Sequence, residues 1–335
     1  MARTRGATGS EPRAEAGHDL RLVLRAATMY HLEGATQAEI ARRLGISRPT
    51  VGRLIARAAH AGLVRVVFDI PDHLAASVHT GLERDLELQY GLEEVVVVED
   101  EIDYGNAAAM AALGRAAADV LTRRIRPDDV LGFTWGPETV ALADAVSGRP
   151  ASCRAVVQLD GSMTQSSYRT GVDHVLSRLS SALGAEPFRL LAPLYADSAT
   201  AAALRADSFI SQPLRLGEAA DAMVFGCGHL STDTTLFQGA YIDHDDMAEL
   251  TSLGAVGEVA GQFYGPDGAD TTSSLSARTV SVPLDKVRAC PLTILATGGS
   301  HKHASILAAV RGGLAKVLVT DHDCARWLNE QEDSR

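Results

Sequence analysis

Residues 33–65 read EGATQAEIARRLGISRPTVGRLIARAAHAGLVR and predict two short helices joined by a tight turn. Thr36 is followed three residues later by Glu39, which is the spacing of a capping box, where each side chain bonds a free backbone N–H of the first turn. A first helix therefore begins at Thr36. Gly45 can adopt the left-handed conformation that ends a helix, and the apolar face before it consists of Ile40, Ala41 and Leu44.

A second helix is predicted over residues 47–60. Ser47 is a favourable N-cap, and Pro49 lies in the first turn, where a missing N–H costs little. The spacing i, i+3, i+4 and i+7 places one apolar stripe on this helix, formed by Val51, Leu54, Ile55 and Ala58. The opposite face is then basic and polar, with Arg48, Thr50, Arg53 and Arg57.

Two helices with a glycine turn between them, the second with a basic outer face, are typical of a helix-turn-helix whose second helix enters the DNA major groove. The alternative is an ordinary helical hairpin with a solvated polar face. We favour double-stranded DNA as the partner, because the caps, the turn and the apolar spacing have separate physical reasons and agree. The residues expected to contact DNA are Thr36, Gln37, Ser47, Arg48, Thr50, Arg53 and Arg57.

Charge is unevenly distributed along the 335 residues. Residues 1–71 contain 11 Arg, no Lys and 6 acidic residues, a net charge of +5, whereas the remainder carries 20 basic and 36 acidic residues, a net charge of −16. Only the basic segment suits a polyanion such as DNA, since phosphate contacts supply much of the affinity of DNA-binding proteins. The overall charge of −11 is therefore the sum of a basic N-terminal segment and an acidic remainder.

The chain divides into four predicted segments. Residues 1–18 lack an apolar core segment and are expected to form a disordered tail. Residues 19–71 form the DNA-binding domain, with a first helix over 19–32 and a wing strand over 63–70. Residues 72–91 have leucine or valine every four residues and predict either a linker helix with a role in dimerisation or the first helix of the body domain. Residues 92–330 form the body domain.

Strands and helices alternate through the body domain. Short apolar, β-branched runs occur at 95–98, 130–133, 155–159, 188–191, 222–225, 292–296 and 317–319, with helical patterns at 106–124, 138–147, 168–183, 199–208, 245–253 and 302–312. This alternation predicts an α/β fold with a Rossmann-like, mostly parallel sheet and helices on both faces. Ligands bind such sheets at the carboxyl ends of the strands.

Three of these strand ends are rich in glycine: GFTWGPET at 132–139, FGCGHLSTDTT at 225–235 and ATGGSHKHAS at 296–305. The first and third run directly into helices, whose N-terminal N–H groups and dipole favour an anion or an oxygen-rich ligand. Lys302 adds a positive charge beside Gly298 and Gly299. The alternative is that the glycines serve only packing and that Lys302 is a solvated lysine.

Other side chains at strand ends are suited to a sugar. Trp135 offers an apolar surface to a sugar ring, or else is simply a partly buried tryptophan. Gln158, Asp160 and Glu258 carry amides and carboxylates that bind hydroxyl groups, although such residues also cap helices. The four cysteines, at 153, 227, 290 and 324, lack metal-ligand spacing and are expected to be reduced core residues. No metal or cofactor is expected.

These motifs, taken together, resemble the SorC-type sugar-binding transcriptional regulators of bacteria. The resemblance runs from residue 22 to about 328 and includes QAEIARRLGISRPTVGRLIARAAHAGLVRV, VVQLDGS, LLAPLYADS, GAVGEVAGQFYGPDG and ATGGSHKHASILAAVRGGLAKVLVTD in this order. It implies an effector domain similar to the fold of sugar-phosphate isomerases and CoA-transferases, used for sensing without turnover. It also implies homotetramers on an operator. The effector contacts implied are Thr134, Trp135, Gly136, Thr139, Gln158, Gly161, Glu258, Gly298, Gly299 and Lys302.

The sequence departs from the family pattern in two places. Pro137 and Glu138 follow the Trp-Gly pair, where many members have an arginine, and Ser162 stands where a second glycine is common. A carboxylate near a helix N-terminus disfavours a phosphate there, so an uncharged sugar or polyol remains open beside a sugar phosphate.

The sequence thus predicts a cytoplasmic transcriptional regulator of a carbohydrate or polyol operon. Its partners would be operator DNA, a sugar-type effector and further copies of itself, with no membrane association. One alternative is a sugar-phosphate isomerase-like enzyme on the same scaffold, with Asp160 or Glu258 as the base. Another is an oligomerisation protein that binds no ligand.

Overall fold

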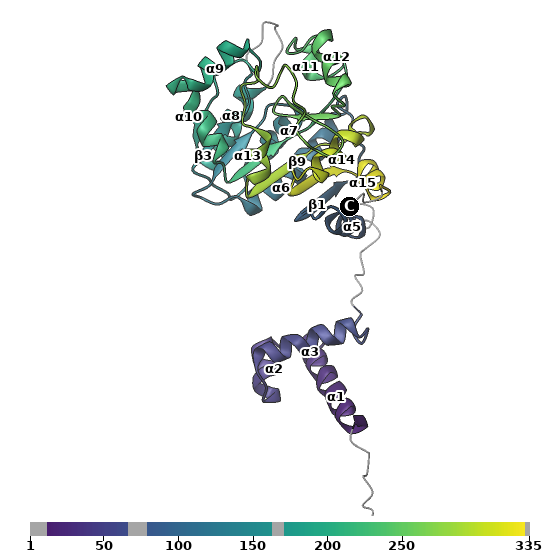
Figure 1. Ribbon diagram of the computed structural model, residues 1–335. Coiled ribbons are helices and arrows are strands. Elements are labelled where there is room, and N and C mark those ends of the chain that lie inside the picture. Colours follow the sequence, from purple (N-terminus) through teal and green to yellow (C-terminus); the bar gives the residue numbers. More distant parts are fainter. Residues whose placement is uncertain (1–11, 66–78, 163–170, 332–335) are drawn as a thin grey trace, which may run out of the picture. The chain divides into compact units, whose positions relative to one another are not determined.

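The computed structural model describes residues 12–65, 79–162 and 171–331, with side chains from Leu20 onward. Its contacts divide the chain into two compact units, Met1–Pro71 and Asp72–Arg335 (Figure 1). Each unit has hydrophobic clusters of its own.

The smaller unit contains the two predicted helices and a longer one before them. Its helices are α1 Pro12–His31, α2 Gln37–Leu44 and α3 Arg48–His60. Thr36 and Glu39 form the predicted capping box, and Gly45 ends α2 with a φ of 67°. Ser47 caps α3 by accepting a hydrogen bond from the Thr50 N–H. The helix-turn-helix prediction is confirmed, and the core consists of Val23, Ala26, Ala27, Met29, Ile40, Val51, Leu54 and Ala58.

Two expectations for the smaller unit need correction. Helix α1 begins at Pro12, so the part of the predicted disordered tail from residue 12 is helical, while residues 1–11 lie outside the described residues. Val23, Ala26 and Ala27 of this helix face the core, whereas Leu20 and Leu24 are 47% and 43% exposed. Residues 63–65 of the predicted wing are not a strand, and its remainder lies outside the described residues.

The helix predicted over 72–91 is described from residue 80 as α5 Thr80–Tyr90. It packs against strand β1 Glu94–Val98 and the last helix, α15 His322–Asn329. Leu86 is fully buried there, and the Tyr90 hydroxyl donates a hydrogen bond to the Leu328 carbonyl at 2.7 Å. The described part of this helix is therefore integrated into the larger unit.

A parallel sheet forms the centre of the larger unit. In the described residues its strand order is β1-β10-β9-β5-β2-β3-β4, and every neighbouring pair is parallel. Beside β1, the strands are β2 Val130–Phe133, β3 Ala155–Gln158, β4 Glu186–Phe188, β5 Ala222–Phe225, β9 Leu292–Ala296 and β10 Val317–Asp321. The predicted α/β class is confirmed.

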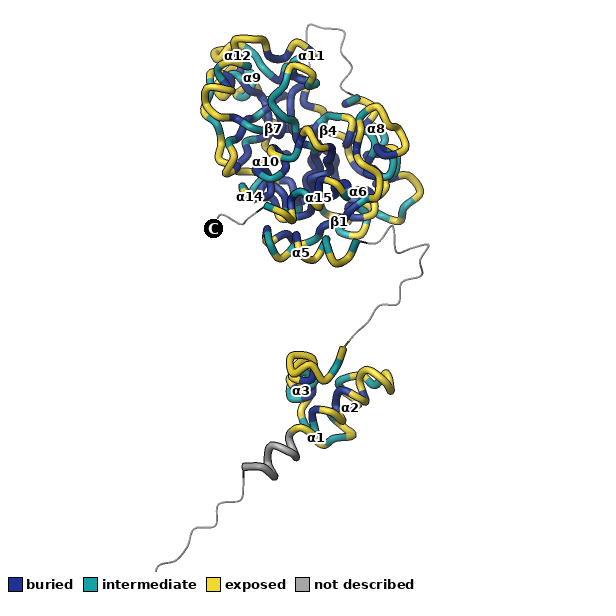
Figure 2. Tube along the Cα trace, turned by 90° about the vertical axis from the view of Figure 1, so that its right-hand side faces the viewer, coloured by how far each residue is buried: buried dark blue, intermediate teal, exposed yellow. Residues whose placement is uncertain are grey.

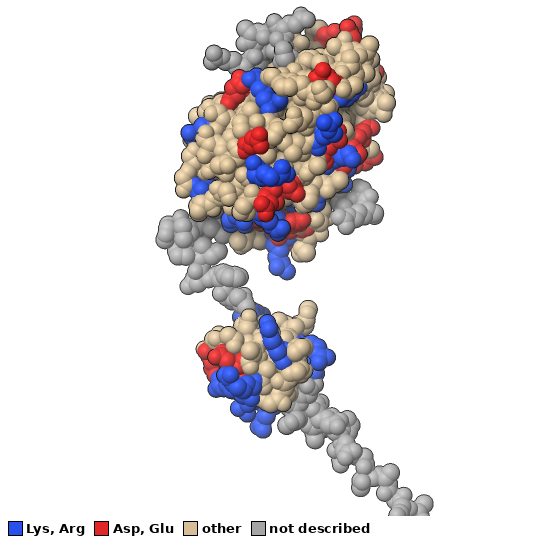
Figure 3. All heavy atoms as spheres, turned by 90° about the vertical axis from the view of Figure 1, so that its left-hand side faces the viewer, with Lys and Arg blue, Asp and Glu red and all other residues tan. Residues whose placement is uncertain are grey.

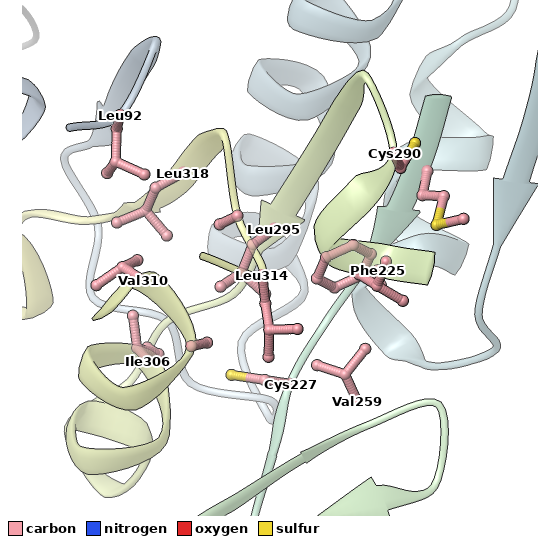
Figure 4. Packing of buried hydrophobic residues seen from close by; sticks show 14 of the residues in the cluster. Leu92, Phe225, Cys227, Val259, Cys290, Leu295, Ile306, Val310, Leu314 and Leu318 are labelled. Atoms are coloured by element: carbon pink, nitrogen blue, oxygen red, sulfur yellow. The ribbon is translucent and has the colours of Figure 1, made fainter. Parts of the chain in front are cut away.

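Helices cover both faces because successive strand residues point to opposite sides. One face packs on α6 Ala107–Arg124, α7 Pro137–Ala145 and α8 Val172–Leu183. The other packs on α5, α13 Leu284–Ala289, α14 His303–Arg311 and α15. Figure 4 shows Leu295 and Leu318 of the sheet beside Ile306 and Val310 of α14. Figure 2 shows the buried residues gathered in the interior of the larger unit.

The direction of winding reverses between β2 and β5, which are neighbours in the sheet. From β2 the chain proceeds through β3 to β4 at one edge, and from β5 through β9 to β10 in the opposite direction. Right-handed crossovers then place the connecting helices on opposite faces, so the loops after β2 and β5 diverge and leave a crevice.

Several elements were not predicted from the sequence. They are α10 Ser208–Glu218, α13, α15, α11 Thr235–Gln238 and a small antiparallel sheet of β6 Gly228–His229, β7 Gly257–Val259 and β8 Gln262–Tyr264. Strands of two or three residues are too short to show an alternating pattern, and Pro213 inside α10 breaks the helical signal. The strand predicted at 188–191 lies earlier, at β4. The remaining helices, α9 Ser198–Ala206 and α12 His244–Ser252, match predicted segments.

All four cysteines are buried and free, as predicted. Among the described residues, no helix has the length and apolar character needed to cross a membrane.

The contact between α6 and α7 depends on a glycine. A Cβ added at Gly114 would lie 2.3 Å from the Ala141 carbonyl oxygen, which is backbone and cannot move aside easily. We predict that Gly114→Ala lowers the free energy of unfolding by about 1–3 kcal/mol through overpacking. Urea unfolding followed by tryptophan fluorescence measures it, because both tryptophans, Trp135 and Trp327, lie in the larger unit.

Gly81→Ala is the matched control, since Gly81 is an exposed helical glycine of α5 with no atom within 4 Å of an added Cβ. It should leave stability unchanged or raise it by up to about 1 kcal/mol. Equal behaviour of the two variants would contradict the tight α6–α7 contact.

Candidate functional site

A cavity of about 480 Å³ lies at the carboxyl ends of β2 and β5, where the winding reverses. Its walls are the loop after β2, the loop after β5, strand β7 and the 3-10 turn η1 Ser300–Lys302 that follows β9. Six of the predicted effector contacts line it, namely Thr134, Trp135, Gly136, Asp160, Glu258 and Lys302. Residues that are distant in the sequence are thus brought together at one end of the sheet.

A buried ion pair forms one side of this cavity. The Lys302 ammonium lies 2.7 Å from the Glu138 carboxylate, and both side chains are less than a tenth exposed. The Tyr104 hydroxyl donates to the same Glu138 oxygen at 2.5 Å, and Lys302 lies 4.4 Å from the centre of the Tyr104 ring. Burial acts to lower the pKa of Lys302, but Glu138 and then Tyr104 outweigh it and raise the pKa. Lys302 therefore stays charged and paired.

Two further carboxyl groups face the cavity. Asp160 is buried, and burial followed by the proximity of Glu258 raises its pKa well above the usual value. Burial also raises the pKa of Glu258 to about 7, against a hydrogen bond from the Gly261 N–H at 2.9 Å. Carboxyl groups with raised pKa values stay protonated closer to neutral pH, so these two side chains offer hydrogen-bond donors as well as acceptors to hydroxyl groups.

An aromatic surface completes the wall. Trp135 stacks on Tyr241 with ring centres 5.2 Å apart, and its indole N–H donates to the Gly161 carbonyl at 2.9 Å. The Tyr241 hydroxyl in turn donates to the Ser162 carbonyl at 2.8 Å. Because the indole N–H already has a partner, Trp135 offers the cavity its ring rather than a donor.

Two histidines also line the cavity. The rings of His229 and His301 meet edge to face with centres 4.8 Å apart, and His229 Nε2 lies 3.3 Å from Asp233. Burial and then His301 lower the pKa of His229, while burial and then Lys302 lower the pKa of His301. Both rings are therefore neutral at pH 7. Among the described residues, no three His, Cys, Asp or Glu side chains are grouped to hold a metal ion.

The other five predicted effector residues do not line the cavity. Thr139 donates to the Gly136 carbonyl at 3.0 Å, and the Gln158 amide donates to the Asp160 carbonyl and accepts from the Leu190 N–H. A Cβ at Gly161 would lie 2.3 Å from the Pro193 oxygen. The Gly299 N–H donates to the buried Asp321 carboxylate at 2.7 Å, and Gly298 packs on the same carboxylate. These residues lie beside the cavity wall and are not among its lining residues.

Several lining residues were not predicted from the sequence, including Tyr104, His229 and Asp233. Tyr104 follows β1 at the edge of the sheet, and no local pattern relates it to Glu138. The glycine-rich segment after β5 was the available signal for His229 and Asp233, because both lie within residues 225–235.

The face of α3 opposite its core is basic. Arg48, Arg53 and Arg57 are exposed, and α3 contains no acidic residue. Thr50 is half-buried and shares a 2.7 Å hydrogen bond with the Ser47 hydroxyl, so both hydroxyls serve the cap. Thr36 likewise bonds Glu39, and the half-buried Gln37 amide reaches Gly52 of α3. Figure 3 shows arginine side chains, in blue, on the visible face of the smaller unit, around one acidic patch.

Family models of known proteins match both parts of the chain. A family model for a sugar-binding domain matches residues 76–328, and a model of the MarR family, a helix-turn-helix family, matches residues 26–73. The first match alone covers more than half of the chain. The chain belongs to the SorC-type family of sugar-binding transcriptional regulators.

Relatives of this regulator resemble it over almost their whole length. The deoxyribonucleoside regulator of Bacillus subtilis is 30% identical over 92% of this chain and 97% of its own. The erythritol catabolism regulatory protein of Brucella abortus is 28% identical over 95% and 99%. The crystal structure of the full-length sorbitol operon regulator of Klebsiella pneumoniae matches with a TM-score of 0.68 at 24% identity, over 93% of this chain and all of that one. The regulator therefore combines a helix-turn-helix unit with a sugar-binding domain.

The raised pKa of Glu258 makes stability depend on pH. The folded chain holds this proton up to about pH 7, whereas an unfolded glutamate releases it near 4.5. Stability is thus full below the unfolded value and falls as the pH rises through the folded one, with Asp160 acting in the same direction. We predict that Glu258→Gln reduces this fall, between about pH 5 and 8, by on the order of 2 kcal/mol. Urea unfolding at several pH values measures it.

Glu249→Gln is the control. Glu249 is half-buried, and hydrogen bonds from Ser274 lower its pKa, so it is ionised in both states throughout this range. Its pH profile should match that of the unchanged chain. An unaltered profile in Glu258→Gln would contradict a protonated Glu258.

Proposed function

We propose that this regulator binds operator DNA through α3 and is controlled by a sugar, polyol or sugar phosphate that occupies the cavity at the carboxyl ends of β2 and β5. The observation that supports this best is the cavity wall, where the Asp160 and Glu258 carboxyls and a stacked tryptophan occur in a chain that also carries a basic helix, α3. Carboxyls suit hydroxyl groups and an aromatic ring suits the C–H face of a sugar. Relatives named for sorbitol, erythritol and deoxyribonucleosides support the same class of effector.

On DNA, α3 lies in the major groove and α2 supports it from the phosphate backbone. Arg48, Arg53 and Arg57 contact base edges or phosphates, with Thr50 beside them. Backbone N–H groups at the N-termini of α2 and α3 meet phosphates, and these positions are occupied by Thr36, Gln37 and Ser47. The site of action is the cytoplasm, where bacterial operators are found.

Control requires the effector to favour one arrangement of subunits over another. The regulator acts as a homodimer or homotetramer, and two recognition helices contact half-sites separated by whole turns of DNA. An effector that binds two arrangements with different affinity shifts the balance between them and so changes operator affinity. Linkage requires the operator to change effector affinity by the same factor.

Arg53 tests the DNA-binding face. An operator is first selected with the unchanged regulator from a pool of random duplexes. We predict that Arg53→Ala then raises the Kd for this operator by about tenfold or more, because a lost base contact costs about 1–3 kcal/mol. Gel-shift titration at fixed salt measures it.

Arg21→Ala is the matched control, since Arg21 is an exposed arginine of α1 and its loss removes the same charge. It should weaken binding to all duplexes slightly and leave preference for the operator intact. If Arg53→Ala bound the operator as tightly as the unchanged regulator, α3 would not be the recognition helix.

A thermal-shift screen of sugars, polyols and their phosphates tests the effector site. We predict that at least one compound raises Tm saturably, because a ligand that binds only the folded state stabilises it by mass action. Trp135→Ala should lose this shift. A screen without any saturable shift would favour the oligomerisation protein that binds no ligand.

The same samples test the enzyme alternative, in which Asp160 or Glu258 removes a proton from a sugar phosphate. We expect NMR to recover every compound unchanged after incubation. Isomerised product that disappears in Glu258→Gln would support the enzyme.

A further inference from the structure

Two features of the cavity region attract anions, and the chain supplies an anion of its own to each. The first is the glycine loop after β9. Its Gly299 N–H donates to Asp321 Oδ2 at 2.7 Å, and the same oxygen accepts from the Ile102 N–H at 3.2 Å. Asp321 is fully buried, and a Cβ at Gly298 would lie 2.3 Å from its carboxylate. This loop is therefore closed to a phosphate.

The second feature is Lys302, which is the one Lys or Arg among the described residues that line the cavity. Glu138, from the first turn of α7, neutralises it at 2.7 Å. Gly226 makes room for this carboxylate, because a Cβ there would lie 2.7 Å from Glu138 Cδ. The Tyr104 hydroxyl donates to the same oxygen as Lys302. Glu138 thus has the partners that a phosphate bound at this position would use.

The remaining ionisable groups on the wall do not compensate. Asp103, Asp160, Asp233 and Glu258 are all carboxyls, and the two histidines are neutral at pH 7. A phosphate monoester would have to displace Glu138 from Lys302, which would leave a buried carboxylate without its cation. A neutral ligand meets no such penalty and can use the Asp160 and Glu258 carboxyls and the Trp135 ring.

We propose that the Glu138 carboxylate pairs with Lys302, the cation of the effector site, and so keeps it from binding a phosphate. The site thereby selects a neutral, hydroxyl-rich effector, a polyol or an unphosphorylated sugar, over its phosphate ester. This proposal rests on the proposed function, since it names the chemical class of the effector. It makes Glu138 a specificity-determining residue, because its carboxylate fills the position beside Lys302 and excludes a phosphate from it.

The test uses inorganic phosphate as the probe, so that it does not require the effector to be known. In Glu138→Gln, Lys302 and Tyr104 lose their anion, and we expect phosphate to bind at least about tenfold more tightly than to the unchanged regulator. Thermal shift and calorimetric titration of the full chain with phosphate measure this affinity. Chloride at equal ionic strength is the reference. The double variant Glu138→Gln, Lys302→Met should lose this gain.

Glu101→Gln is the matched control. Glu101 is an exposed carboxylate outside the cavity wall, so its loss changes net charge equally without freeing Lys302. It should bind phosphate as weakly as the unchanged regulator. An equal gain in Glu101→Gln, or no gain in a folded Glu138→Gln, would overturn the proposal.

A second measurement covers the case in which Glu138→Gln does not fold. The unchanged regulator is titrated with matched pairs, such as sorbitol and sorbitol 6-phosphate or erythritol and erythritol 4-phosphate, and with phosphate alone. We expect no saturable shift with phosphate, and a larger shift with the free compound in any pair that binds. Tighter binding of the ester, or a phosphate shift that Lys302→Met removes, would overturn the inference while leaving an effector-controlled regulator intact. Failure of the proposed function is distinct, because then no compound binds.

Discussion

The buried ion pair between Glu138 and Lys302 connects the two halves of the sheet, which are wound in opposite directions. Glu138 comes from the helix after β2, and Lys302 comes from the turn after β9, on the other side of β5. Neither side chain would be tolerated in the interior alone, because an unpaired buried charge is strongly destabilising. Their pairing, with Tyr104 as a third member, allows a polar cavity to exist at the point where the loops diverge.

Many polar groups around the cavity already have hydrogen-bond partners within the chain. Asp321 holds the glycine loop after β9, the Trp135 indole holds Gly161, and Gln158 supports the backbone at Asp160. Beside apolar side chains, the wall presents the carboxyl groups of Asp160 and Glu258 and the ring of Trp135. Such a wall favours hydroxyl groups, because carboxyl oxygens accept hydrogen bonds from them and a protonated carboxyl can donate one.

The two units divide the charge of the chain between them. Residues 1–71 are net positive, and their recognition helix has no acidic residue, whereas the body that carries the cavity is strongly acidic. Attraction to DNA phosphates is therefore confined to the smaller unit. The larger unit contributes selectivity for a ligand. In the proposed mechanism it also undergoes the change of subunit arrangement that alters operator affinity.

Local patterns in the sequence determined the helix-turn-helix and the α/β class. The capping box at Thr36, the cap at Ser47 and the apolar spacing of α3 act within a few residues, and the apolar runs of the parallel strands are short and well bounded. They also located six residues of the cavity wall at strand ends. Tertiary structure alone decided which of these strand ends meet, because that depends on strand order and on the reversal between β2 and β5. It joined Tyr104 and Lys302 to Glu138 and placed the carboxylate of Asp321, at the end of β10, against the glycine loop. These contacts link residues far apart in the chain and leave no periodic trace in the sequence.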